Sequence, residues 1–402
     1  MKLVRQASAL LLWAALSVSR GLFAQGGFAY VSPVAADQAR VSLRSVEVRY
    51  VQPTLPRLMA TPASVRALYV NAWAFGSPRL WQLVRLADET EINAFVIDVK
   101  DDTGCLLYPS AVPTAQQIGA NQCVRTKEVR ARLDTLFVHG IYPIARIVVA
   151  KDPRLALGKP QWSVHQADGT LWRDRIGSAW VDAYNDSVWT YSGQLAQEAV
   201  RLGFAEVQFD YVRFPDEPRE RLATAIFSAR RPGDTPRLAV RRHVQMLKTQ
   251  VGTLGVPVTF DIFGLTASAT DDMGIGQVWE DFSSVADVVL PMVYPSHYRA
   301  GSYGFARPNG EPYRIVRRAL QEALGRSRAA DAAEIRPYLQ AFTLGRRLPR
   351  YTGFEIRQEI RATEDVGITS WVLWNPRSVY QRDALRPFTA PAIIRALGDR
   401  GD

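Results

Sequence analysis

Short runs of β-branched and aromatic residues alternate along most of the chain with segments that have the apolar spacing of helices. Each run is short enough for one buried strand, and each segment between runs is long enough to cross over a sheet. Such an alternation predicts parallel strands joined by right-handed crossovers. Eight strands are expected, at residues 66–73, 94–102, 142–150, 206–214, 257–265, 287–295, 336–344 and 370–376.

Four of the segments between strands carry recognisable helix ends. A polar residue that can cap the first turn precedes each helical pattern, and in three of them a glycine follows the last turn. The predicted helices begin at Ser77-Pro78, Thr126, Asn185 and Thr352, and the last three end near Gly140, Gly203 and Gly367.

Eight strand–helix units that close on themselves form a (β/α)8 TIM barrel, which we predict as a single α/β domain over residues 63–390 with long βα loops. A doubly wound open sheet has the same alternation. The first strand, however, is followed by AFGSPRL rather than GxGxxG, and GxxxxGK[ST] does not occur. The missing phosphate loops favour the barrel and argue against nucleotide binding.

The chain begins with the features of a secretory signal. Lys2 and Arg5 precede an apolar run that is short for a membrane span, and small residues follow it. We predict a signal peptide over residues 1–24, with an uncleaved anchor as the alternative. Residues 25–62 are expected to be a linker or lead-in and residues 391–402 a C-terminal tail, with no membrane span after signal cleavage.

Export makes the two cysteines informative. Cys105 and Cys123 are the only pair and bracket a loop rich in Pro and Gly. In an oxidising compartment a disulfide is expected there, contributing about 3 kcal/mol by loop closure, and two free thiols are the alternative. The protein is accordingly predicted to be periplasmic or secreted, and monomeric.

Composition and charge narrow the classes of partner. Hydrophobic residues make up 47% and charged residues 22% of the chain, which fits a soluble protein with a large core. The formal charge of +10 comes from arginines scattered along the chain rather than clustered on one element. Since nucleic-acid binding needs a concentrated basic surface, no nucleic-acid partner is expected.

One strand carries polar residues where apolar ones are expected. An isolated Asp in an apolar strand would destabilise the folded state by several kcal/mol through desolvation, unless it is paired or faces water. In GFAEVQFDYVRFPDEP, alternation points Gln208 and Asp210 into the barrel, at the face where TIM barrels build their active sites. The same reasoning brings other residues to this face: Asp98, Lys100, Arg146, Asp261, Tyr294 and Trp374.

These residue types suit the cleavage of a glycosidic bond. The four histidines form no HExxH motif, and GxSxG is absent, so a zinc or serine hydrolase is poorly supported. Glycosidases use two carboxyl groups beside the bond, with aromatic rings and polar groups holding the sugar. A carbohydrate substrate is expected, with no metal and no other cofactor.

The block QFDYVRFPDE, with WVDAYNDSVWTYSGQLAQEAVRLGF before it and ALYVNAW in the first strand, resembles a glycoside hydrolase family of barrel domains catalogued as a domain of unknown function. The resemblance covers about residues 64–380. It implies a TIM barrel that hydrolyses a sugar polymer and is related to amylase-like and chitinase-like barrels.

The chain departs from the mechanisms of those relatives. The chitinase-like DxxDxDxE would require an acid where Val212 stands, and Pro295 follows Met292-Val-Tyr294 where an Asp is usual. Amylase-like barrels have an Arg two residues before the nucleophile. In this chain that position, two residues before Asp210, is occupied by Gln208. Catalytic roles therefore have to be assigned by position.

We predict that Asp210 is the nucleophile or charge stabiliser, kept ionised by Arg213 or Arg146, and that Asp261 is the general acid/base with a pKa raised by Asp210. Asp216, Glu217 and Glu280 are reserve acids on loops. The predicted substrate-binding residues are Asp98, Lys100, Arg146, Gln208, Arg213, Tyr294, Trp374 and Trp73.

The long segment 153–184, which contains three tryptophans, is expected to form one wall of the groove, and 215–235 a lid or insert. The alternative function is a non-catalytic, glycan-binding barrel of the cell envelope. In that case Asp210 and Asp261 would lie far apart or be tied in salt bridges.

Overall fold

The computed structural model describes residues 58–388 apart from 328–331 and 347. The predicted signal peptide, most of the lead-in and the C-terminal tail lie outside the described residues. In the described part of the chain, no helix has both the length and the apolarity needed to cross a bilayer.

The strands form one closed, parallel barrel, which confirms the predicted fold. The sheet order is β5-β4-β3-β2-β1-β9-β8-β6-β7, and a further pairing of β5 with β6 closes it. All eight predicted runs contain a strand, and the seventh barrel position has an additional short piece, β7, before β8. The strands are β1 (Arg66–Val70), β2 (Ala94–Lys100), β3 (Tyr142–Val148), β4 (Glu206–Asp210), β5 (Val258–Phe263), β6 (Val288–Met292), β7 (Glu334–Ile335), β8 (Tyr338–Gln340) and β9 (Trp371–Trp374).

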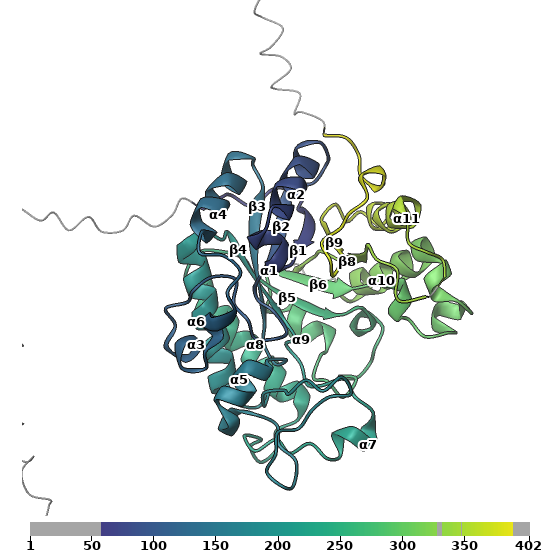
Figure 1. Ribbon diagram of the computed structural model, residues 1–402. Helices are drawn as coiled ribbons and strands as arrows, with labels where there is room; N and C mark the ends of the chain where they lie inside the picture. The colour runs from purple at the N-terminus through teal and green to yellow at the C-terminus, as the bar shows by residue number, and fades with distance from the viewer. Residues whose placement is uncertain (1–57, 328–331, 347, 389–402) are drawn as a thin grey trace, which may run out of the picture. The chain divides into compact units, whose positions relative to one another are not determined.

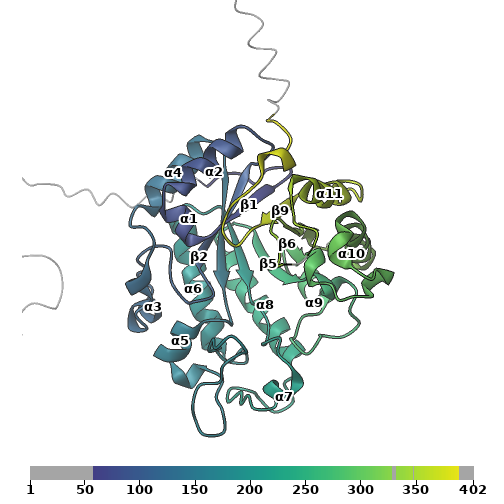
Figure 2. The same ribbon diagram turned by 45° about the vertical axis from the view of Figure 1, so that its right-hand side comes forward.

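Helices surround the barrel, as Figure 2 shows, while α5 and α7 lie on loops that extend from one of its ends (Figure 1). The α-helices are α1 (Ala72–Gly76), α2 (Arg79–Asp88), α3 (Pro113–Gln117), α4 (Val129–Val138), α5 (Pro153–Gly158), α6 (Asp186–Leu202), α7 (Arg219–Leu222), α8 (Pro236–Gly252), α9 (Trp279–Ser283), α10 (Pro312–Arg326) and α11 (Gly353–Glu364).

The helix ends follow the predicted caps in most cases. The Asn185 side chain accepts a hydrogen bond from the backbone of Ser187, and Gly203 ends α6 in the left-handed conformation. Thr352 forms a complete capping box with Glu355 at the start of α11. The start predicted for α4 is two residues too early: the helix begins at Val129, because the Thr126 hydroxyl accepts the Glu128 N–H in a turn before it.

Two strands are shorter than predicted, for local reasons. β1 stops at Val70 because the Asn71 side chain accepts the Ala74 N–H and caps α1. β4 stops at Asp210 because Tyr211 has a φ of 53°, which no strand residue adopts. Both strands therefore end at the carboxyl-terminal face of the barrel.

The core has two layers, one inside the barrel and one between the strands and the helices. Alternate strand residues such as Ala67, Val96, Ile144, Leu290 and Val372 form the inner cluster. The larger cluster packs the opposite strand faces against the helices. The apolar inner layer supports the polar side chains at the carboxyl ends of the strands.

The predicted disulfide between Cys105 and Cys123 is present, with the two Cα atoms 5.5 Å apart. It ties down the loop after β2. The long loop 153–184 is folded on itself by isolated bridges, among them Ser163 with Val181, and its His165 pairs with Ile226 of the segment 215–235. These connections fix the walls at the carboxyl end of the barrel.

Candidate active site

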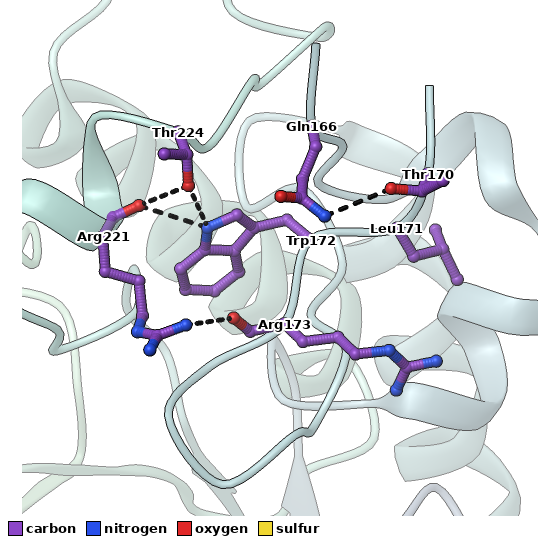
Figure 3. Close-up of a pocket in the computed structure, with 7 residues that line it drawn as sticks. All are labelled: Gln166, Thr170, Leu171, Trp172, Arg173, Arg221 and Thr224. Carbon is purple, nitrogen blue, oxygen red and sulfur yellow. Dashed lines mark hydrogen bonds between the residues drawn. The ribbon is translucent and has the colours of Figure 1, made fainter. Parts of the chain in front are cut away.

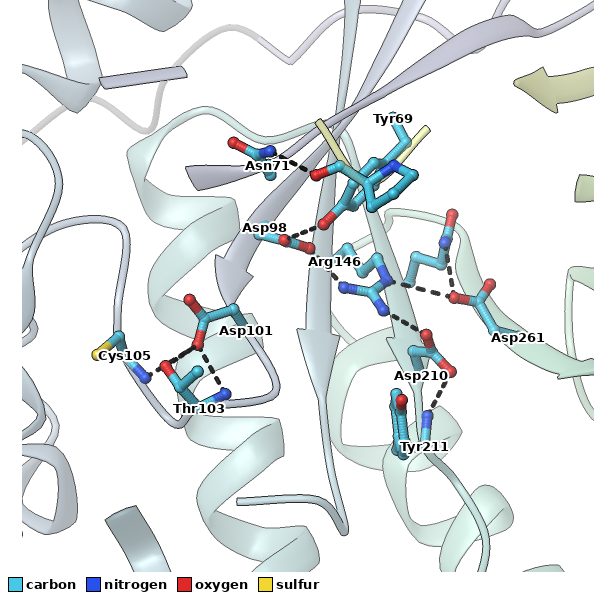
Figure 4. Close-up of polar contacts among 12 residues, drawn as sticks. Tyr69, Asn71, Asp98, Asp101, Thr103, Cys105, Arg146, Asp210, Tyr211 and Asp261 are labelled. Atoms are coloured by element: carbon cyan, nitrogen blue, oxygen red, sulfur yellow. Dashed lines mark hydrogen bonds and ion pairs between the residues drawn. The ribbon is translucent and has the colours of Figure 1, made fainter. Parts of the chain in front are cut away.

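One arginine side chain joins three carboxylates at the carboxyl ends of β2 to β5 (Figure 4). Arg146 on β3 has its Nη1 atom 2.5 Å from Asp98 Oδ1, its Nη2 atom in contact with Asp210 Oδ2 and its Nε atom 3.6 Å from Asp261 Oδ2. The strand register pairs Asp98 with Arg146 and Arg146 with Gln208, and Asp210 is the next inward position above Gln208. Adjacent parallel strands therefore bring the four charged groups to one place.

Asp98 is held deep in this cluster. The Tyr69 hydroxyl donates to its Oδ2 atom at 2.5 Å, and only 2% of Asp98 is exposed. Burial raises the pKa of Asp98 to about 6, although Arg146 and the hydrogen bond from Tyr69 oppose the rise. Asp98 can therefore change its charge near neutral pH.

Asp261 is the most deeply buried of the three acids, with 1% exposure. Gln208 Nε2 donates to its Oδ2 atom at 3.0 Å and to the Tyr338 hydroxyl at 2.6 Å. Its Oδ1 atom has no hydrogen-bond partner among the described residues. Burial first, and then the negative charge of Asp210, raise the pKa of Asp261 well above its usual range, which favours the protonated form of this carboxyl.

Asp210 differs from Asp261 in its surroundings. It contacts the guanidinium of Arg146, and its Oδ1 atom accepts the Tyr211 N–H at 2.5 Å. The left-handed backbone of Tyr211 makes this contact possible and turns the chain away after β4. A carboxyl group that contacts a guanidinium thus lies beside one whose pKa is raised, and acids in such different surroundings can take different roles.

A cavity of about 610 Å³ opens onto this cluster. That volume lies in the range of small-molecule sites, roughly 300–1,000 Å³. Arg146, Asp210 and Asp261 lie in its lining, and the rings of Tyr294 and Trp374, stacked 5.5 Å apart at 24°, form part of the wall. The cavity thus combines carboxyl groups with aromatic surface.

The loops predicted to enclose the groove do so. Asp174, Ile176 and Trp180 come from the segment 153–184, and Asp216 and Glu217 come from 215–235; all five line the cavity. The third reserve acid, Glu280, instead forms an ion pair with Arg326 on α10, with 2.5 Å between Oε2 and Nη2, and is not among the lining residues.

The structure brings most of the predicted site residues together but not Lys100. The register shifts between Asp98 and Lys100, and the Lys100 ammonium lies 2.6 Å from Asp152 Oδ2 and 5.1 Å from the centre of the Tyr191 ring on α6. Lys100 is fully buried on the helix side of β2. The prediction that it shares the face of Asp98 is wrong, because the irregularity in β2 reverses the alternation.

Trp73 also lies outside the cavity lining. It is on α1, 67% exposed, with the Arg125 guanidinium 3.8 Å from the centre of its ring. Its role in sugar binding stays a prediction.

Two residues that the sequence analysis missed, Tyr69 and Tyr338, hydrogen-bond within the cluster. Only their inward position on β1 and β8 could have indicated this role.

A second, smaller cavity of about 410 Å³ lies between the loop 153–184 and the region of α7 (Figure 3). The Trp172 indole forms its floor and donates to the Arg221 carbonyl at 3.3 Å and to the Thr224 hydroxyl at 3.2 Å. No carboxyl group lines this cavity. It therefore lacks the acid pair that distinguishes the first one.

In the described part of the chain no group of three or more His, Cys, Asp or Glu is arranged to hold a metal ion.

Among the similar solved structures, one glycoside hydrolase domain supports the fold. The glycoside hydrolase domain of PgaB (BpsB) from Bordetella bronchiseptica is 15% identical, with a TM-score of 0.55 over 81% of this chain and all of that domain (100%). A hypothetical protein from Ruminiclostridium thermocellum is 35% identical over 52% of this chain and 98% of its own, with a TM-score of 0.44. The glycoside hydrolase domain of PelA from Pseudomonas aeruginosa is 15% identical over 80% and 97%, with a TM-score of 0.44.

The chain matches no curated protein. A family model, however, matches residues 67–380, which is nearly the whole barrel from β1 to the segment after β9. The acid cluster and its cavity lie within that match. The protein therefore belongs to the family described as "Putative glycosyl hydrolase domain" and is a probable glycoside hydrolase.

Proposed function

We propose that the protein is an exported glycoside hydrolase that cleaves a polysaccharide or envelope glycan with Asp210 and Asp261. The observation that carries the proposal is the unequal pair of acids in the cavity lining, Asp210 in contact with Arg146 and Asp261 with a pKa raised by burial. Glycoside hydrolysis needs this pairing of a charged and a protonated carboxyl group. The disulfide and the signal-like N-terminus support export.

In this mechanism Asp261 donates its proton to the glycosidic oxygen as the bond to the anomeric carbon breaks. Asp210 stabilises the positive charge that develops on the sugar ring, either as an ion or by bonding to the anomeric carbon. Gln208 fixes the Asp261 carboxyl, and the stacked pair of Tyr294 and Trp374 supplies a face for the sugar. Arg146 keeps the cluster from carrying excess negative charge.

The experiment measures the hydrolysis of a panel of bacterial exopolysaccharides through the reducing ends that are released. Asp210→Asn and Asp261→Asn should each lower kcat by about 100-fold or more, since each removes a group that acts on the reacting atoms. Asp134→Asn, which changes an exposed acid on α4, is the matched control and should keep the parent rate. Full activity of folded Asp210→Asn would disprove the assignment.

A specific observation favours a second candidate function, a non-catalytic barrel that binds glycan. Arg146 contacts all three aspartates, so the acids are engaged in ion pairs before any sugar is present. This candidate predicts that the parent protein binds a glycan of the panel without releasing reducing ends. It also predicts that Asp261→Asn, which keeps the shape of the cavity, binds as tightly as the parent.

A further inference from the structure

Arg213, three residues after Asp210, is a buried cation that forms no ion pair with the described residues. It is 8% exposed, and its one hydrogen bond among the described residues runs from Nη1 to the Phe214 carbonyl at 3.0 Å. The other buried arginines of the barrel interior have carboxylate partners: Arg146 contacts Asp98, and Arg336 lies 2.7 Å from Glu206. In the described residues no carboxylate lies within 4 Å of Arg213. A buried charge in this state is costly unless a ligand neutralises it.

Aromatic rings hold the Arg213 guanidinium in place. Its Cζ atom lies 4.6 Å from the centre of the Phe263 ring, 4.7 Å from that of Tyr211 and 5.4 Å from that of Trp180. Such cation–π contacts are attractive, but they leave the positive charge in place. Burial lowers the pKa of Arg213, which shows how little solvent reaches it.

The guanidinium lies in the wall of the cavity that holds the acid pair. Tyr211, with its φ of 53°, turns the chain so that Asp210 and Arg213 both line this space. Backbone strain of this kind is usually retained where a site needs it. Lys151 lies on the same wall, 5.5 Å from the centre of the Tyr211 ring, with Asp102 at 3.2 Å.

The acids that share this cavity wall are engaged elsewhere or exposed. Asp174 Oδ2 accepts from the Trp180 indole at 3.0 Å. Glu217 lies 3.5 Å from Arg221, and Asp216 is exposed. Asp210 contacts Arg146. Asp210 and Asp216 attract Arg213 from a distance, but none of these groups forms an ion pair with it, so the wall presents a positive charge that can pair with whatever fills the cavity.

We propose that Arg213 binds the carboxylate of an acidic sugar, so that the substrate class is a glycan containing uronic acid. The planar fork of a guanidinium matches a carboxylate through two parallel hydrogen bonds. Since Arg213 and Asp210 are close in sequence and line one cavity, the acidic sugar lies at or next to the bond that is cleaved. The inference rests on the proposed function for the cleavage, but the binding step can be tested without turnover.

The test measures binding of free glucuronate and galacturonate to the full chain, next to glucose and galactose, by saturation-transfer NMR and calorimetry. Each uronate should bind about 10-fold or more tightly than its neutral counterpart, as expected for a charge-assisted pair. Arg213→Gln should abolish the difference, and Arg213→Lys, which keeps the charge but not the fork, should reduce it. Arg201→Gln, which removes an exposed positive charge on α6, should leave it unchanged.

Equal binding of acidic and neutral sugars by the parent protein, or no binding of either uronate, would overturn the inference even if Arg213→Gln failed to fold. A uronate preference that survives in folded Arg213→Gln would also overturn it. Binding of sulfate and inorganic phosphate is measured in the same way. If either binds at Arg213 more tightly than the uronates do, the site selects an inorganic anion rather than a sugar carboxylate, and the inference is overturned. Hydrolysis of a neutral glycan that depends on Asp210 would refute the acidic substrate and leave the proposed function standing.

Discussion

Replacing Asp98 by Asn should change how the stability of the protein depends on pH. The pKa of Asp98 is about 6 in the folded protein, against an ordinary value of 3.8. The folded state therefore binds more protons than the unfolded state between these values, and the carboxyl lowers stability as the pH rises through this window. The difference of 2.2 units, 6 minus 3.8, corresponds to about 3 kcal/mol at neutral pH for this buried group.

An Asn side chain can accept the hydrogen bond from Arg146 with its oxygen and donate from its amide nitrogen to the Tyr69 hydroxyl oxygen, but it cannot ionise. The free energy of unfolding of Asp98→Asn, minus that of the parent, should therefore rise by about 2–3 kcal/mol between pH 4 and pH 7. Urea unfolding of both proteins at several pH values, with the disulfide intact, measures this difference. Other titrating groups contribute nearly equally to both proteins and cancel.

Asp134→Asn is the control for the loss of a carboxyl group at an exposed position. The difference between its free energy of unfolding and that of the parent should vary little with pH. Parallel stability curves for the parent and Asp98→Asn over this range would show that burial does not raise the pKa of Asp98. A difference that falls with rising pH would mean that Arg146 outweighs burial and that the sign is reversed.

Three further predictions follow from single contacts. Lys100→Met leaves Asp152 buried and unpaired, so the free energy of unfolding in urea should fall by about 3–5 kcal/mol; unchanged stability would contradict the pairing. Gln208→Leu removes a hydrogen bond that lowers the pKa of Asp261, so the alkaline limb of the pH–activity profile should move to higher pH, and an unmoved limb would exclude Asp261 as the acid. Cys105→Ser removes the crosslink between residues 18 apart and should lower the free energy of unfolding by about 3 kcal/mol, as reduction of the parent should; a variant as stable as the oxidised parent would refute this.

The barrel could be predicted from sequence because its signals are local and repeated. The strand runs are short and apolar, and the caps at Asn185 and Thr352 form the hydrogen bonds that their residue types favour. The inward positions of Asp210 and Asp261 followed from the period of two in a regular strand. These features depend on neighbours in the chain, so the sequence contains them directly.

The features that the sequence did not reveal depend on irregular backbone or on distant partners. The irregularity in β2 turned Lys100 to the helix side, and no residue type near it marks that change. Tyr69 and Tyr338 look like core aromatics until the opposite strands place acceptors and donors beside their hydroxyl groups. The distance between Arg213 and the nearest carboxylate is a property of the folded loops and has no sequence signature.

The number of charges at the barrel mouth explains why the acids take different roles. Three carboxylates surround the single guanidinium of Arg146, and if all were ionised the buried cluster would carry an excess of two negative charges. Burial works against such an excess, and its effect is strongest on Asp261, which has the least contact with solvent and the weakest contact with Arg146. One cation for three acids thus favours the protonated form of Asp261, while Asp210 keeps its contact with Arg146. The imbalance that makes the cluster electrostatically costly is therefore also what would give the proposed mechanism its proton donor, Asp261, next to Asp210.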